Sequence, residues 1–246
     1  MHLASRLRGK FPRLALTEDF SFARHTTICC GGSAEAAAMP ACAEEAAQLL
    51  TFLERERIPY CYLGAGANVL PAEGRFEGVV VRFCNMNTLY ADGTSLYAGA
   101  GVTGGRLLAF AAANAIGGFE PLSGIPTSVG GGITMNAGVK ELHFGDVTER
   151  VIAAEKGKIY TLSQSECRFS EKSSLFQQGI AVLGAYFTGK RSDARTIAAR
   201  ACDFRRRRAG LPKGRCMGCA FVNPPARSAG EVIATWGVKN PSVGGA

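Results

Sequence analysis

The chain has 246 residues, enough to bury the core of one large or two small domains. Hydrophobic residues make up 47% and charged residues 20%, a globular composition that excludes disorder. No run of about 18 apolar residues could span a membrane, and the basic N-terminus lacks the apolar core and cleavage site of a signal peptide. We therefore expect a cytoplasmic protein with no membrane partner.

Hydrophobic periodicity predicts a mixture of helices and short strands. In chain order, we expect a strand and glycine turn over 24–38, a helix over 41–57 ended by Pro59, strands at 60–63, 79–83, 88–91 and 95–100, a helix over 104–115 capped by Gly117 and Gly118, strands at 151–154, 158–162 and 180–187, and helices over 193–209 and 228–235. The Asp92-Gly93 pair predicts a hairpin. Because no regular βαβ alternation is visible, the pattern predicts an α+β fold with a mixed or antiparallel sheet.

The net charge is +8, and the densest run of basic residues is 205–208, which are all arginine. Clustered arginines can bind nucleic acid, but no aromatic-rich strand, zinc spacing or recognition helix accompanies them, so we expect no nucleic-acid partner. A solvated basic face is the first interpretation, and contact with a diphosphate-bearing substrate is the second.

Nine cysteines are an odd number, which argues against a disulfide framework. Cys216 and Cys219 have C-x-x-C spacing. A zinc site needs about four ligands, and the sequence has no second pair with suitable spacing. We predict no metal.

Two glycine-rich segments are candidate ligand loops. A short apolar strand runs directly into residues 64–69, which is how a chain brings backbone amides to a phosphate. Residues 123–138 combine clustered glycines with short polar side chains and, we expect, freely oriented amides that suit phosphate or a flat heterocycle. A purely structural glycine turn is the alternative for residues 123–138.

Four segments in order, 24–32, 63–70, 124–138 and 218–224, resemble the signatures of the UDP-N-acetylenolpyruvoylglucosamine reductase family, also called UDP-N-acetylmuramate dehydrogenases. These are FAD enzymes of peptidoglycan precursor synthesis. The resemblance implies a two-subdomain FAD-binding fold of the PCMH/VAO type with a C-terminal substrate domain. It also implies FAD and NADPH as cofactors and a UDP-sugar as substrate, and we expect a monomer.

The resemblance places FAD-binding subdomain 1 at residues 1–76, subdomain 2 at 77–190 and the substrate-binding domain at 191–246. Family members continue past Ala246 with a segment that carries a catalytic glutamate, so we expect this last domain to be truncated. The implied cofactor-binding residues belong to the two glycine-rich segments: Gly64, Ala65, Gly66, Ala67, Asn68, Val69, Ser123, Gly124, Ile125, Pro126, Ser128, Gly130, Gly131, Asn136, Ala137 and Gly138.

In the family, NADPH reduces FAD, and the flavin then delivers hydride to the enolpyruvyl double bond of UDP-N-acetylglucosamine enolpyruvate. The resulting enolate-like species needs a proton and a nearby positive charge. Cys219 stands where most members have the proton-donating serine, and a free thiol, with a pKa of about 8.5, is mostly protonated at neutral pH. Lys172 replaces the arginine that steadies the enolate, keeping the charge without the bidentate fork.

Three more positions depart from the family pattern. Ala67 replaces a serine at the flavin diphosphate, Glu171 replaces a tyrosine beside Lys172, and Val222 replaces the lysine of the last motif. Together with the expected truncation, these changes support one alternative, an FAD-binding homologue without the reductase activity.

Overall fold

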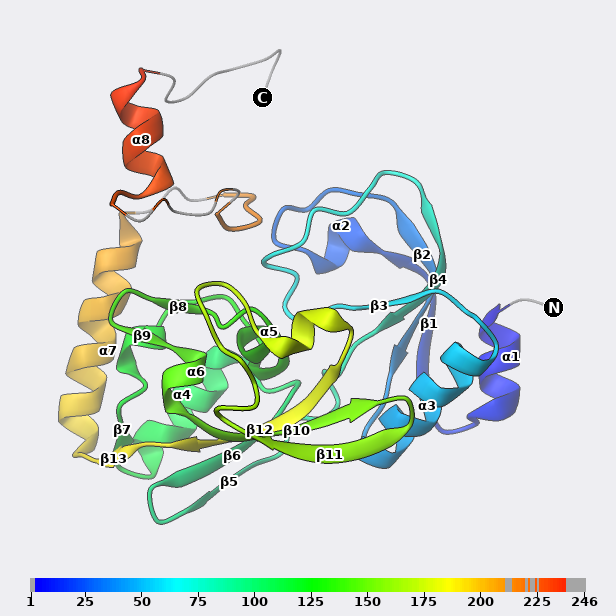
Figure 1. The fold of residues 1–246 in the computed structure, drawn as a ribbon, viewed down its shortest axis with the longest axis horizontal. Coiled ribbons are helices and arrows are strands. Elements are labelled where there is room, and N and C mark those ends of the chain that lie inside the picture. The colour runs from blue at the N-terminus through cyan, green and yellow to red at the C-terminus, as the bar shows by residue number, and fades with distance from the viewer. Residues whose placement is uncertain (1–2, 211–213, 220, 222–223, 225, 238–246) are drawn as a thin grey trace.

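The computed structural model describes residues 3–210, 214–219, 221, 224 and 226–237. Figure 1 shows two sheets with helices packed around them and a long helix along the side farthest from the N-terminus. No helix among the described residues is long and apolar enough to cross a membrane. Val222 and residues 238–246 lie outside the described residues, so the expectations that fall on them stay predictions.

The first sheet carries strands in the order β1-β2-β4-β3. Its elements are α1 (Leu3–Lys10), β1 (Ala15–Ser21), α2 (Phe22–His25), β2 (Ser33–Met39), α3 (Ala43–Arg55), β3 (Tyr60–Tyr62) and β4 (Arg75–Val81). β1 pairs antiparallel with β2, whereas β4 pairs parallel with both β2 and β3. The leucines of α3 recur at helical spacing and pack on the alanines of β2 and the valines of β4. This packing forms the core under the first sheet.

Two expectations for this half were wrong. Residues 24–38 hold no strand followed by a glycine turn: the end of α2 comes first, and Gly31 and Gly32 then turn the chain into β2. The boundary predicted between residues 76 and 77 falls inside β4. Because all of β4 pairs within the first sheet, that sheet extends to Val81.

The second sheet is entirely antiparallel, with the order β11-β10-β12-β6-β5. Its strands are β5 (Leu89–Asp92), β6 (Ser95–Gly99), β10 (Thr148–Glu155), β11 (Lys158–Ser163) and β12 (Ala181–Thr188). Alternate side chains such as Leu96, Val151 and Phe187 face a core shared with α4 (Gly104–Ala113) and α5 (Val129–Thr134). The predicted hairpin at Asp92-Gly93 is confirmed, with Gly93 at a φ of +59°.

Shorter elements connect these layers. They are β7 (Ile116–Gly117), the 3-10 helices η1 (Glu120–Leu122) and η2 (Leu175–Gln178), the hairpin of β8 (Gly138–Val139) and β9 (Leu142–His143), α6 (Phe144–Val147) and β13 (Lys190–Arg191). The expected glycine cap of α4 was wrong, because the helix already ends at Ala113 with Asn114 as its C-cap. Ala115, directly after the C-cap, has a φ of 54°, and Gly118 further on has a φ of +105°.

The last two helices are α7 (Ala194–Ala209) and α8 (Ala229–Thr235). α7 packs against η1 and α4, and Ile197 is its one buried residue. α8 begins with a capping box in which Ser228 and Glu231 each bond the other's backbone amide, and it buries none of its described side chains. Figure 1 shows α8 projecting beyond the two sheets, at the end of the molecule where α7 finishes.

Leu50 tests the account of the first core. Its side chain in α3 is 1% exposed, and we expect Leu50→Ala to lower the free energy of unfolding by about 2–5 kcal/mol, because a cavity replaces the lost contacts. Leu70→Ala is the matched control, since Leu70 is 62% exposed and its truncation should cost less than about 0.5 kcal/mol. Equal losses in urea unfolding for the two variants would contradict this packing.

Candidate active site

The turn at residues 64–69 has unused backbone donors. β3 ends at Tyr62, Leu63 is buried in the core, and the chain then leaves the sheet. Within the described part of the chain, no backbone amide from Gly64 to Val69 donates a hydrogen bond. Such a row of free amides at the end of a strand is what a phosphate-binding turn requires.

The opposite side of this turn is fixed by Thr27. The carbonyl of Gly66 accepts a hydrogen bond from the Thr27 amide at 3.0 Å, and the Thr27 hydroxyl, whose one proton is shared with Cys216 O, lies 3.3 Å from it. Gly66 has a φ of +68°, and a Cβ there would lie 2.3 Å from the carbonyl oxygen of His25. Only glycine fits this position without displacing backbone.

The second glycine-rich segment differs from expectation in one respect. Its central glycines lie in α5, and their amides are used inside the protein: Ser128 Oγ accepts from Gly131, and the Gly130 amide donates to Ala100 at 2.9 Å. A Cβ at Gly132 would lie 2.7 Å from the Phe144 ring. The expectation of freely oriented amides at these three glycines was therefore wrong, because the glycines serve close packing of α5.

The two glycine-rich segments contact each other, although the first follows a strand of the first sheet and the second includes α5, which packs on the second sheet. A Cβ on Gly64 would lie 2.5 Å from Ser128 Oγ and 3.7 Å from Gly131 Cα. Gly64 therefore lies against Ser128 and Gly131. The predicted cofactor residues differ in accessibility. Gly64, Ala65, Asn68, Gly124 and Pro126 are exposed; Ala67, Val69, Ile125, Gly130, Gly131, Ala137 and Gly138 are half-buried; Gly66, Ser123, Ser128 and Asn136 are buried.

Asn136 has a structural role that the sequence did not suggest. Its side chain is buried, donates from Nδ2 to Ser170 O at 2.8 Å and accepts the Gly145 amide on Oδ1 at 2.8 Å. Ser170 begins a tight turn closed by two backbone hydrogen bonds with Ser173, and this turn carries Lys172. Asn136 therefore joins the end of the second glycine-rich segment to the turn that holds the candidate catalytic lysine.

Residues 216–219 and Phe221, which overlap the last family match, lie against both halves of the molecule. The Cys216 amide donates to Thr27 O at 3.2 Å, and the Thr27 hydroxyl donates to Cys216 O. A Cβ on Gly218 would lie 3.3 Å from the carbonyl of Ala67. Residues 216–218 therefore lie beside the turn at residues 64–69.

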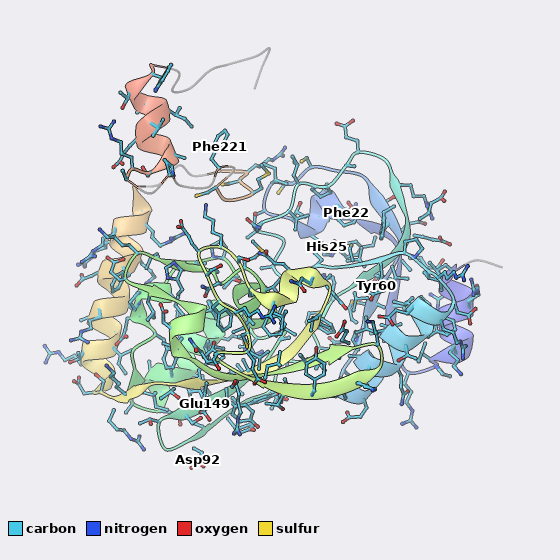
Figure 2. All side chains as sticks on the ribbon, viewed as in Figure 1. Phe22, His25, Tyr60, Asp92, Glu149 and Phe221 are labelled. Carbon is cyan, nitrogen blue, oxygen red and sulfur yellow. The ribbon has the colours of Figure 1, made fainter. Side chains whose placement is uncertain are left out.

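Lys172 approaches the same segment from the second half of the molecule. Its Nζ donates to the carbonyl of Phe221 at 3.0 Å, just past the exposed Cys219. Figure 2 labels Phe221 on this segment, at the end of the molecule opposite Asp92 and Glu149. The structure thus brings Lys172 to the stretch of chain that also carries Cys219, two residues before Phe221.

Thr27 and Arg208 lie in segments that the sequence pointed to, but neither was among the predicted site residues. Thr27 lies inside the 24–32 match, so the motif was visible, but its contacts with both Gly66 and Cys216 depend on the fold. Arg208 in α7 donates from Nε to Gly124 O at 3.2 Å, and Arg205 lies 3.6 Å from the Cβ position of that glycine. Arg208 brings positive charge to the second glycine-rich segment, and Arg205 contacts it through its Cγ methylene.

A cavity of about 420 Å³ lies elsewhere, on the second sheet. Figure 2 places its residues Asp92 and Glu149 far from Phe221. Its walls are Tyr90, Asp92, Ser95, Tyr97, Glu149, Arg150 and Tyr186, with none of the predicted cofactor residues among them. The candidate site is therefore the meeting point of the two glycine-rich segments.

The residues present fit a dinucleotide with a flat ring. Free amides at residues 64–69 supply donors for a diphosphate, and the exposed backbone at Gly64 and Gly124 allows close approach. Positive charge from the Arg208 guanidinium lies next to Gly124.

Comparison with known proteins agrees with this geometry. Residues 34–162, more than half of the chain, match the FAD binding domain family. The UDP-N-acetylenolpyruvoylglucosamine reductase of Caldanaerobacter subterraneus is 34% identical over 91% of this chain and 75% of its own length. The reductase of the same name from Geobacter sulfurreducens is 34% identical over 99% of this chain and 82% of its own.

Solved structures support the same assignment. The crystal structure of UDP-N-acetylenolpyruvylglucosamine reductase from Thermus caldophilus superposes with a TM-score of 0.81 at 30% identity, covering 94% of this chain and 83% of that one. Cholesterol oxidase from Brevibacterium sterolicum, at 14% identity and a TM-score of 0.57 over 73% of this chain and 38% of its own, shares the fold alone. The predicted α+β FAD-binding fold is confirmed, and the chain belongs to the UDP-N-acetylenolpyruvoylglucosamine reductase family.

Proposed function

We propose that this protein binds FAD and uses NADPH to reduce UDP-N-acetylglucosamine enolpyruvate in peptidoglycan precursor synthesis. One observation carries the proposal: Lys172 Nζ contacts the carbonyl of Phe221, two residues past Cys219. The same segment lies against the turn at residues 64–69, through Cys216 on Thr27 and Gly218 on Ala67. The reaction needs an acid, a cation and a turn that binds the FAD diphosphate close together.

The proposed FAD contacts divide into two groups. The free amides of residues 64–69 hold the diphosphate, and residues 123–126 present backbone to the ring system. Bound FAD supplies the hydride chemistry, which no side chain can provide. Buried Ser128 and Asn136 act by positioning α5 and the 170–173 turn rather than by holding the cofactor from the open side.

Cys219 is the proposed proton donor. It is exposed at the surface of the site, three residues beyond the backbone contacts that fix Cys216 on Thr27. The Cys219 thiol gives its proton to the carbon next to the carboxylate as the substrate double bond is reduced, and the resulting thiolate is reprotonated from solvent. Its exposure supplies the route for that return.

Lys172 is the proposed cation beside the developing enolate. Its backbone has a φ of 53°, in the left-handed region, and the 170–173 turn holds it there. Its ammonium group already donates to Phe221 O and carries further donors that can face the substrate. Glu171 beside it is exposed, whereas Lys172 is half-buried toward the site.

Lys172→Ala tests this role. We expect the variant to reduce the UDP-sugar about 10²-fold more slowly, because the charge that stabilises the enolate is lost. Reduction of bound FAD by NADPH should be unchanged. Lys172→Arg keeps the charge and should retain more than about a tenth of the activity. The assignment fails if the alanine variant reoxidises with the UDP-sugar at the normal rate in stopped-flow measurements.

We extend the proposal to organisation. The first sheet with its helices, up to Val81, forms one FAD-binding subdomain. The second sheet with its helices and the β7–β13 pair, up to Arg191, forms the other, and the following residues begin the substrate-binding part. Arg205 and Arg208 favour an anionic substrate such as a UDP-sugar. We propose a cytoplasmic protein, since NADPH and nucleotide sugars are cytoplasmic compounds, and the expected monomer stays a prediction.

Turnover of the UDP-sugar tests the function as a whole. Purified, FAD-loaded protein should oxidise NADPH only when UDP-N-acetylglucosamine enolpyruvate is present, and mass spectrometry should find a product heavier by two hydrogens. NADPH oxidation that is independent of the UDP-sugar, or no such product, would favour an FAD-binding homologue without this activity.

A further inference from the structure

The proposed reaction uses Cys219 and leaves Cys216 without a task. Both cysteines are free and exposed in the structure. Cys216 Sγ lies 3.2 Å from the amide nitrogen of Gly218 and 3.9 Å from its carbonyl oxygen. That carbonyl belongs to the peptide unit that leads into Cys219, so the sulfur of Cys216 lies beside its C-x-x-C partner.

The backbone between the two cysteines bends to allow this approach. Gly218 has a φ of +86°, a conformation that glycine adopts without strain. The backbone of Cys216 is held by Thr27, whose carbonyl accepts its amide and whose hydroxyl donates to its carbonyl. Because the Cys219 side chain is exposed, we infer that rotation about its Cα–Cβ bond brings its sulfur toward that of Cys216.

A metal is the other use for this spacing. Among the described residues, no group of three or more histidine, cysteine, aspartate or glutamate side chains could hold an ion. Two thiolates alone do not make a structural zinc site. The geometry therefore favours redox chemistry between the two sulfurs.

We propose that Cys216 and Cys219 form a reversible disulfide that switches the enzyme off by consuming its proton donor. The proposal rests on the proposed function of Cys219. The oxidant is a peroxide: the Cys219 thiolate attacks one peroxide oxygen, the O–O bond breaks, and hydroxide leaves to give a sulfenic acid. The Cys216 thiolate then attacks that sulfur, the S–S bond forms and a second hydroxide leaves. In sum, two thiols and hydrogen peroxide give one disulfide and two waters.

Oxidation stops the reaction because it removes the proton that Cys219 would donate. A disulfide sulfur carries no proton, so the oxidised site can bind its ligands but cannot complete reduction of the UDP-sugar. A dithiol reverses the bond by exchange and restores the acid. A serine at this position, as in most family members, could not enter this chemistry.

Peptide mapping tests the disulfide without reference to activity. Trypsin cuts after Arg215 and Arg227 and so releases both cysteines in one peptide that holds no other cysteine. After peroxide treatment of the full chain and alkylation of free thiols, we expect this peptide unalkylated and lighter by two hydrogens. Recovery of two alkylated thiols, or Cys216 joined to a different peptide, would overturn the proposal even if the protein has no reductase activity.

Variants test the switch itself, with peroxide removed before each assay. After peroxide treatment, the native chain should reduce the UDP-sugar at least ten-fold more slowly, and dithiothreitol should restore the rate. Cys216→Ser should keep basal activity but, after prolonged peroxide, should not recover, because unresolved Cys219 proceeds to the irreversible sulfinic acid. Cys219→Ser should be active, and peroxide should not change its activity. Cys29→Ser, at an exposed nearby cysteine, should lose and regain activity as the native chain does. Full recovery of the oxidised Cys216→Ser variant would contradict the role of Cys216.

Discussion

Cys219→Ala is expected to slow reduction of the UDP-sugar by about 10²–10⁴-fold, the usual contribution of a general acid. Alanine cannot donate a proton, and no other thiol or acid is part of the proposed machinery at this segment. Because hydride transfer from NADPH to FAD needs no acid from the protein, that half-reaction should keep its rate. Single-turnover stopped-flow spectroscopy of the two half-reactions measures this difference.

Cys219→Ser is the matched control. Serine is the residue that most members of the family have here, and its side chain differs from cysteine only in the donor atom. We expect at least a tenth of the native rate. An alanine variant that matches the native rate in the second half-reaction would remove Cys219 from the mechanism.

Gly66→Ala is expected to have the largest effect on cofactor binding. The alanine Cβ would lie 2.3 Å from the His25 carbonyl oxygen and 2.8 Å from Thr26 Cα, both backbone atoms that cannot move away freely. The φ of +68° adds about 1–2 kcal/mol of strain for a residue other than glycine. The turn at residues 64–69 must shift, so we expect at least ten-fold weaker FAD binding and a lower melting temperature.

Gly74→Ala controls for a glycine substitution of the same kind. A Cβ on Gly74 would meet nothing within 4 Å, and its φ lies outside the left-handed region. This variant should bind FAD as the native chain does, measured by flavin content and by titration of the apoprotein. Native FAD affinity in Gly66→Ala would show that the turn does not hold the cofactor.

The sequence predicted those elements that have strong periodicity. The helix expected over 41–57 is α3 at Ala43–Arg55, and the hairpin at Asp92-Gly93 was found from its turn residues. α1 and β1 were missed. β1 alternates poorly, and most of its residues are exposed, so its strand conformation depends on pairing with β2 and not on a local pattern.

The motifs predicted which segments form the site, but not how they are joined. Gly64 meets Ser128, and Lys172 meets Phe221, only after the two sheets have packed, and no spacing in the sequence reports such contacts. The same limit explains the error about α5. Its glycines suggested open amides, whereas the Gly130 amide pairs with Ala100 at the end of β6. Local composition cannot show which donors tertiary structure uses.

The visible absorption spectrum of the purified protein tests the central claim most directly. We predict flavin bands that bleach under anaerobic NADPH and return when UDP-N-acetylglucosamine enolpyruvate is added. That cycle requires FAD at the glycine-rich segments and the acid and cation beside it. Protein that stays colourless after incubation with FAD, or reduced flavin that the UDP-sugar does not reoxidise, would contradict the account.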